Sequence, residues 1–270
     1  MSLITSNWLE NNLDKVKLID CSWHMPNVKR NAYQEYLKEH IPGAVFFDLD
    51  KNSDTNTDLP HMLPDAIIWE EILSNLGISN SDRIIIYDNS DVLSACRCWY
   101  NFLYFGHDPN LVSVLDGGLK KWILENKIVN SNKVKIQKSE YKSQEKKNLV
   151  KNKNQIDSNI NIKDFLVVDA RSKERFEGKV PDPRKNVRSG SIPNSFCLPF
   201  KEILNEDNTF KNTEEISQQF MQIIDIEHNN IVFSCGSGVT ACVLALAYSL
   251  VNNKYSPTIY DGSWAEYGKI

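Results

Sequence analysis

The sequence predicts an α/β protein built from two tandem domains, each with a mostly parallel central sheet flanked by helices. Short runs rich in β-branched residues alternate with helical stretches such as 69–76 and 95–105, a pattern typical of strand–helix units. The chain has 270 residues, enough for two domains of ordinary size. The same order of signals occurs twice, about 150 positions apart, which indicates a duplicated domain.

The duplication rests on four landmarks that follow one another in both halves. They are a strand that ends in Asp, an Ile-Pro turn, a buried strand, and an Asp-Gly pair followed by Trp. In the first half they are 16–20, 40–44, 84–88 and 115–118 with Trp122, and in the second half 165–171, 191–195, 231–235 and 260–263 with Trp264. Because the stretch between the halves is rich in Lys, Asn and Ser, we expect domains over 1–135 and 155–270, joined by a solvated polar linker over 136–154.

The composition limits the classes of binding partner and the cellular compartment that we expect. A net charge of −4 gives no support for nucleic acid or an anionic membrane surface as a partner. The first ten residues lack the basic and apolar regions of a signal peptide, and no run is long and apolar enough to span a membrane. Six cysteines are scattered without a disulfide or metal-binding spacing. We therefore expect a cytoplasmic monomer with no metal and no cofactor.

Cys235 is the strongest candidate for a catalytic residue. It follows a short apolar run, 231–234, that predicts a buried strand, and it precedes an apolar run, 241–247, that predicts a buried helix. A thiol at the N-terminus of a helix is favoured as thiolate by the unpaired N–H groups and the helix dipole. The alternative is a buried structural cysteine. Gly236 and Gly238 favour the nucleophile, because they let the backbone approach the sulfur closely.

The duplication assigns this chemistry to the second half. Asp88 stands at the position equivalent to Cys235. Since a carboxylate cannot act as the same sulfur nucleophile, we expect the first half to be a non-catalytic domain.

The segment 235–241, Cys-Gly-Ser-Gly-Val-Thr-Ala, resembles the active-site loop of the two-domain sulfurtransferases of the rhodanese superfamily. It is most similar to the branch that uses 3-mercaptopyruvate, whereas the branch that prefers thiosulfate carries basic residues after the cysteine. Supporting segments are 40–48, 61–64, 116–118, 169–171, 175–178 and 181–184. The resemblance implies that Cys235 takes the sulfur of a 2-oxo thiol acid and becomes a persulfide. The persulfide then passes this sulfur to an acceptor, which is thioredoxin, a small thiol or cyanide.

The resemblance also implies roles for other residues. Arg175 and Arg184 match arginines that bind the substrate carboxylate, for which the planar guanidinium is well suited; the alternative is an ordinary surface ion pair. Ser237 would relay a proton as pyruvate leaves, or would simply cap a helix. His61 and Asp50 would complete a Cys–Ser–His/Asp arrangement across the domain interface. The alternatives are that His61 makes only a structural hydrogen bond and that Asp48, rather than Asp50, is the aspartate that matters.

The backbone of the loop is expected to hold the persulfide. The main-chain N–H groups of 236–241 form a cradle suited to a negatively charged sulfur. This assigns substrate-binding positions to four residues besides the arginines: Gly236, Gly238, Val239 and Thr240.

Three other functions compete with this hypothesis. A cysteine phosphatase needs an arginine six residues after the cysteine, where this chain has Ala241. A thiosulfate:cyanide sulfurtransferase gains from cations beside the persulfide, and the loop supplies none. A non-enzymatic rhodanese-like module would need no cysteine, which the second half retains.

Overall fold

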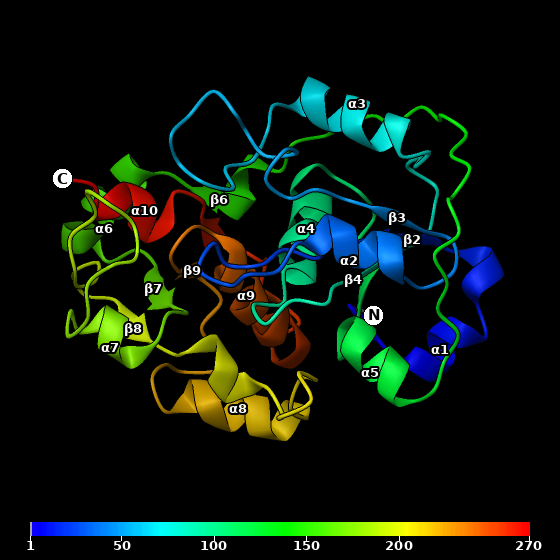
Figure 1. Ribbon diagram of the computed structural model, residues 1–270. Coiled ribbons are helices and arrows are strands. Elements are labelled where there is room, and N and C mark those ends of the chain that lie inside the picture. The colour runs from blue at the N-terminus through cyan, green and yellow to red at the C-terminus, as the bar shows by residue number, and fades with distance from the viewer. Residues whose placement is uncertain (1) are drawn as a thin grey trace. The chain divides into compact units, whose positions relative to one another are not determined.

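The chain divides into two compact units, each drawn in Figure 1. The first consists of the chain up to Thr55 with Leu63–Lys146 and Glu206–Thr209, and the second of Asn56–Met62, Lys147–Asn205 and Phe210–Ile270. Within residues 2–270, which the computed structural model describes, each unit carries one sheet of five parallel strands. The predicted α/β class is confirmed, and the two boundaries proposed for the linker stay a prediction.

The first unit alternates strands and helices as the sequence predicts. Its strands lie in the order β1-β5-β4-β2-β3, so that β4 and β2 are central. The elements in chain order are β1 (Leu3–Ile4), α1 (Ser6–Glu10), η1 (Leu13–Lys15), β2 (Lys17–Asp20), α2 (Ala32–Lys38), β3 (Ala44–Phe46), α3 (Ala66–Asn75), β4 (Ile84–Tyr87), α4 (Ala95–Tyr104), β5 (Val112–Leu115) and α5 (Gly118–Leu124).

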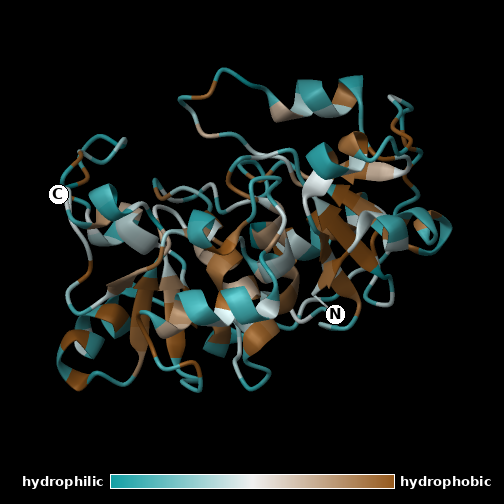
Figure 2. Cartoon of the chain, turned by 90° about the horizontal axis from the view of Figure 1, so that it is seen from below, coloured by the Kyte–Doolittle hydropathy of each residue, from teal (hydrophilic) through white to brown (hydrophobic). Residues whose placement is uncertain are grey.

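The first sheet is buried on both faces, as its continuous apolar strands require. On one face Leu18 and Ile85 pack in a core with Leu9 of α1 and Trp122 of α5. On the other face α3 and α4 meet through Trp69, whose ring lies edge-on to that of Phe102 with centroids 5.3 Å apart. Figure 2 shows the strands in the brown of hydrophobic residues.

The second unit repeats this arrangement. Its strands lie in the order β6-β10-β9-β7-β8, which is the first order with each strand replaced by its counterpart. The elements in chain order are η2 (Lys147–Leu149), β6 (Val150–Lys151), α6 (Lys153–Ile162), β7 (Leu166–Asp169), α7 (Lys173–Phe176), β8 (Phe196–Cys197), η3 (Phe200–Ile203), α8 (Thr213–Met221), β9 (Ile231–Ser234), α9 (Val239–Val251), β10 (Ile259–Tyr260) and α10 (Ser263–Tyr267).

Aromatic side chains fill both faces of the second sheet. Val232 packs with Trp264 of α10 and with α6 on one face, whereas the ring of Phe233 points to the other. There Phe233 meets the rings of Phe220 from α8 and Tyr248 from α9, at centroid distances of 6.0 and 6.1 Å. The buried helix predicted after Cys235 is therefore α9, which packs against the strand that precedes the cysteine.

The polar stretch between the halves is more ordered than its composition predicts. Residues 133–146 form no helix or strand but run along the first unit, where the N–H of Ser139 donates to the carbonyl of Ser74 over 3.1 Å. Tyr141 is buried and stacks on His107 with an interplanar angle of 5°. The remaining part of the expected linker forms η2, β6 and the start of α6 in the second unit. Backbone pairing, which composition does not reveal, anchors this segment.

In the described residues no helix is long and apolar enough to cross a membrane.

Candidate active site

Cys235 lies on a tight loop between β9 and α9, as the sequence predicts. Figure 1 labels the two elements that this loop joins. Gly238 occupies the N-cap position of α9 with φ of 76°, a left-handed conformation that favours glycine. The residue Cys235 is 2% exposed. The loop therefore shields the cysteine from bulk water and places it four residues before the start of a 13-residue helix.

The side chain of Ser263 stabilises this loop by hydrogen bonds. The sequence analysis assigned no role to Ser263. Its Oγ accepts the N–H of Cys235 over 3.2 Å and that of Gly238 over 3.1 Å, and it donates to the carbonyl of Tyr260 over 2.8 Å. All three hydrogen-bonding positions of the hydroxyl group are thus used. The backbone of the next residues adds two bonds, from Trp264 to the carbonyl of Cys235 and from Ala265 to that of Gly236.

The bond to Ser263 changes the expected persulfide cradle. The N–H of Gly238 already has an acceptor, so it does not point free toward a ligand. The structure records no acceptor within the described chain for the N–H groups of Gly236, Ser237, Val239 or Thr240. These four groups remain available to hold a negatively charged sulfur.

The two predicted arginines meet at one buried carboxylate. Asp182, whose side chain is 1% exposed, accepts from Nη2 of Arg175 over 2.7 Å and from Nη1 of Arg184 over 3.3 Å. Its Oδ1 also accepts the backbone N–H of Arg184 over 3.0 Å. Burial alone would raise the pKa of Asp182, but the hydrogen bonds from Arg175 and from the Arg184 backbone outweigh it and lower the pKa.

The arginines face the loop rather than open solvent. A Cβ at Gly236 would lie 3.2 Å from both terminal nitrogens of Arg184 and 3.5 Å from Nη2 of Arg175. The Nε of Arg175 is buried, and no described residue accepts its hydrogen bond. An unsatisfied buried donor is costly and is expected where a ligand completes the bonding. The two cations therefore lie together beside the residue that follows the cysteine, and the predicted binding of a substrate carboxylate stays a prediction.

Ser237 and His61 are brought together. Nδ1 of His61 lies 2.9 Å from Oγ of Ser237, and both residues are buried. His61 has φ of 62°, so the backbone holds it in an uncommon conformation. Capping is not the task of Ser237, because Gly238 holds the N-cap position. The segment with His61 belongs to the second unit, so that the cysteine, the serine and the histidine share one compact unit.

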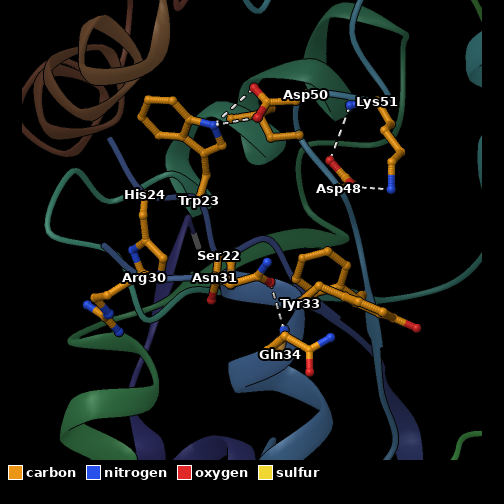
Figure 3. A pocket seen from close by; sticks show the side chains of 13 residues that line it. Ser22, Trp23, His24, Arg30, Asn31, Tyr33, Gln34, Asp48, Asp50 and Lys51 are labelled. Atoms are coloured by element: carbon orange, nitrogen blue, oxygen red, sulfur yellow. Dashed lines mark hydrogen bonds and ion pairs between the residues drawn. The ribbon is translucent and has the colours of Figure 1, made fainter. Parts of the chain in front are cut away.

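Asp50 belongs to the first unit, where it lines a cavity of about 320 Å³ near the ends of β2 and β3 (Figure 3). Both of its carboxylate oxygens lie 3.0 Å from Nε1 of Trp23. The neighbouring Asp48 instead bonds the backbone and the ammonium group of Lys51. The two aspartates thus have different partners, and the catalytic role suggested for Asp50 stays a prediction.

Asp88, the counterpart of Cys235, ties its own loop together. Its carboxylate accepts the N–H groups of Ser90 over 2.9 Å and of Ala95 over 2.6 Å. Burial raises the pKa of Asp88 to about 7, against the lowering effect of these two hydrogen bonds. Its acceptor positions serve the fold of the first unit, which agrees with a structural rather than a nucleophilic role.

The remaining cysteines do not form a second site. Cys96 and Cys98 are buried within α4, and all six cysteines of the chain are free thiols. Over residues 2–270 no cluster of three His, Cys, Asp or Glu side chains is placed to hold a metal ion.

The fold and this loop define a duplicated parallel α/β protein with one cysteine loop. The model of the rhodanese-like domain matches residues 5–125 and again 152–269, so the chain belongs to the rhodanese family. It is 38% identical to the mitochondrial thiosulfate/3-mercaptopyruvate sulfurtransferase 1 of Arabidopsis thaliana, over 98% of this chain and 75% of that protein. It is also 38% identical to 3-mercaptopyruvate sulfurtransferase of Mus musculus, over 98% of this chain and 91% of that protein.

A solved structure agrees with these relatives. The chain superimposes on SseA from Escherichia coli, a 3-mercaptopyruvate sulfotransferase of the rhodanese fold, with a TM-score of 0.87. The match has 31% sequence identity and covers 98% of this chain and 99% of SseA. The resemblance inferred from the cysteine loop is therefore confirmed along nearly the whole chain.

Proposed function

We propose that the protein transfers the sulfur atom of 3-mercaptopyruvate to a thiol or cyanide acceptor through a persulfide on Cys235, releasing pyruvate. The observation that carries this proposal is the pair of guanidinium groups against Gly236, next to the cysteine. A 2-oxo thiol acid has its carboxylate and its sulfur only a few bonds apart. Its carboxylate can therefore bind Arg175 and Arg184 while its sulfur reaches Cys235.

In the first half-reaction the Cys235 thiolate attacks the sulfur of 3-mercaptopyruvate. The new S–S bond forms as the C–S bond breaks, and the electron pair of that bond leaves with carbon as the enolate of pyruvate. One proton then converts the enolate to pyruvate. The enzyme keeps a persulfide, so that a difficult transfer is divided into two easier ones.

The Ser237–His61 pair can supply this proton. The hydroxyl group of Ser237 lies two residues from the nucleophile, and Nδ1 of His61 lies within hydrogen-bonding distance of it. Proton delivery by the serine, with the histidine to replace the proton, matches this geometry. We propose the pair as the general acid, with Asp50 as a further candidate from the first unit.

Charge on the persulfide is balanced by the backbone. The N–H groups of Gly236, Ser237, Val239 and Thr240 have no acceptor within the described residues, and the last two belong to the first turn of the 13-residue helix α9. Their partial positive charges favour a negatively charged outer sulfur. The N–H of Gly238 is left out of this proposal, because Ser263 accepts it.

A second candidate donor is thiosulfate. Two guanidinium groups also suit a small dianion, and the Arabidopsis relative is named for both substrates. The loop itself favours 3-mercaptopyruvate, because Gly236 and Ser237 stand where basic side chains would assist thiosulfate.

Steady-state kinetics with the two donors tests the proposed substrate. We expect kcat/KM for 3-mercaptopyruvate, followed by pyruvate release, to exceed that for thiosulfate with the same acceptor. An advantage of tenfold or more for thiosulfate would contradict the proposal. No turnover of either donor, with no sulfur bound to the protein, would favour a non-enzymatic binding module.

We further propose that the protein works as a monomer in the cytoplasm. Six free cysteines fit a reducing compartment. Light scattering tests the monomer and cell fractionation tests the compartment; a stable dimer or an organellar location would correct these points without affecting the chemistry.

A further inference from the structure

A cavity of about 430 Å³ lies within the second unit, beside the cysteine loop. One wall is the segment 58–60, another is the segment 184–187, and Ala265 and Lys269 from the C-terminal region close it. Every lining residue belongs to the second unit. The volume falls in the range of small-molecule sites, about 300–1,000 Å³.

Two walls of the cavity contact the loop directly, and the third adjoins a residue that does. Arg184 lines the cavity and approaches Gly236 from the side. The N–H of Ala265 donates to the carbonyl of Gly236 over 2.9 Å. Pro60 is followed by His61, which bonds Ser237. A molecule in the cavity is therefore a neighbour of the loop that holds the nucleophile.

The lining is positively charged and partly apolar. Arg184, Lys185 and Lys269 contribute three cations, whereas Asp58 contributes one carboxylate. Lys185 makes no ion pair with any described residue. The ion pair of Lys269 is weak, because its Nζ lies 3.9 Å from Oδ2 of Asp58, whose side chain is 96% exposed. Apolar contact comes from the segment 58–60 and from Val187. These features suit a small molecule with more than one carboxylate and a short apolar or peptide body.

We propose that this cavity binds the sulfur acceptor and that the acceptor is a small thiol peptide with free carboxylates. The inference rests on the proposed function, because it supplies the second substrate of that reaction. Lys185 and Lys269 hold the two carboxylates, and Asp58 accepts the ammonium group of such a peptide. The thiol then points past Arg184 toward Cys235.

The transfer step balances without a further reagent. The acceptor thiolate attacks the outer sulfur of the Cys235 persulfide and forms a new S–S bond. The bond between the two sulfurs of the enzyme breaks, and its electron pair returns to Cys235 as thiolate. The product is the persulfide of the acceptor, and the enzyme is ready for another 3-mercaptopyruvate.

Exchange of both lysines tests the site by kinetics. In the full chain with Lys185→Gln and Lys269→Gln, we expect KM for glutathione to rise about fivefold to tenfold with little change in kcat. KM for 2-mercaptoethanol, which has no charge to lose, should change less than about twofold. Lys201→Gln, an exposed lysine of the same unit outside the cavity, is the matched control and should change neither.

A binding measurement separates this inference from the proposed function. S-methylglutathione cannot accept sulfur, so titration calorimetry measures its binding to the resting enzyme without turnover. Weaker binding to the double variant than to the control supports the site, even if 3-mercaptopyruvate proves not to be the donor. Equal binding to both, or equal KM changes for the charged and uncharged thiols, would overturn it. Transfer only to a protein dithiol such as thioredoxin, with no binding of S-methylglutathione, would overturn it as well.

Discussion

At the scale of single residues, Asp182 organises the proposed substrate site. Its side chain is buried and bonds both arginines, whereas the sequence analysis assigned this aspartate no role. The resemblance of the segments 175–178 and 181–184 to the family predicted the arginines. The shared carboxylate could not be predicted, because it depends on how a proline-bounded turn folds back on α7.

Asp182→Asn should therefore impair substrate binding more than chemistry. The amide keeps the shape of the side chain but loses the charge that fixes two guanidinium groups, so KM for 3-mercaptopyruvate should rise about tenfold while kcat changes little. Steady-state kinetics measures both constants. Glu177→Gln, on the same segment but outside this cluster, serves as the control. An unchanged KM for Asp182→Asn would show that the arginines do not need this carboxylate.

Ser263 is the second residue that sequence reasoning missed. Its role depends on contacts with a loop 28 positions earlier, and a lone serine after Asp-Gly gives no local signal for them. One signal was available: the serine stands where the first half has Gly118, and both positions have positive φ. A side chain at a position whose backbone conformation favours glycine indicates that this side chain has a specific structural or functional role.

Two substitutions at Ser263 separate its conformation from its hydroxyl group. Ser263→Gly relieves the positive φ of 48° but leaves the N–H groups of Cys235 and Gly238 without their acceptor. Ser263→Ala loses the acceptor and keeps the strain, so both variants should lose kcat. Each buried N–H left unpaired costs about 1–3 kcal/mol, and thermal unfolding should show a larger loss for alanine than for glycine. Full kcat in Ser263→Gly would show that the hydroxyl group is dispensable.

At the scale of elements, the turn from β9 into α9 could be predicted from the sequence, whereas the shortest strands and the segment 133–146 could not. An apolar strand, a glycine loop and an apolar helix follow one another in the sequence, and the structure has each of them. By contrast β6, β8 and β10 are two residues long, too short for any periodicity. The segment 133–146 was also beyond prediction, because backbone bonds to the first unit hold it rather than an apolar pattern.

The two loop glycines should respond differently to alanine. At Gly236 the new methyl group would press on the guanidinium of Arg184, so KM for 3-mercaptopyruvate should rise severalfold with little loss of stability. At Gly238 the positive φ makes alanine unfavourable by about 1–2 kcal/mol, so the thermal midpoint should fall. Kinetics and thermal unfolding of both variants test the contrast. The same KM change in both would mean that Arg184 does not press on Gly236.

At the scale of the whole molecule, duplication organises both the fold and the chemistry. The repeated landmarks predicted two similar sheets, and the strand orders agree position for position. The same comparison located the nucleophile, because Asp88 and Cys235 occupy equivalent loops. What the repeat could not reveal is the internal bonding of Asp88, which makes this carboxyl group part of the stability of the first unit.

Asp88 should make the stability of the protein depend on pH. Because burial raises the pKa of Asp88 to about 7, the folded chain keeps a proton that the unfolded chain releases above about pH 4. Its contribution to stability is therefore present below about pH 4 and is lost as the pH rises to about 7. As the pH rises through this window, the free energy of unfolding of Asp88→Asn should increase relative to that of the wild type by up to about 1.4 kcal/mol for each pH unit.

Urea unfolding at about pH 5 and about pH 8 measures this difference. Asp14→Asn, at an exposed position of the same unit, controls for the loss of a carboxylate. A difference between wild type and Asp88→Asn that stays constant with pH would contradict a buried carboxyl group that titrates near neutrality.

The most direct test of the account follows the sulfur atom. The protein is incubated with 3-mercaptopyruvate without an acceptor, alkylated, digested and analysed by mass spectrometry, while pyruvate is quantified in the same sample. The account predicts one added sulfur on the peptide that contains Cys235, one pyruvate for each, and neither in Cys235→Ser. Pyruvate release from a folded Cys235→Ser variant, or a persulfide on another cysteine, would contradict it.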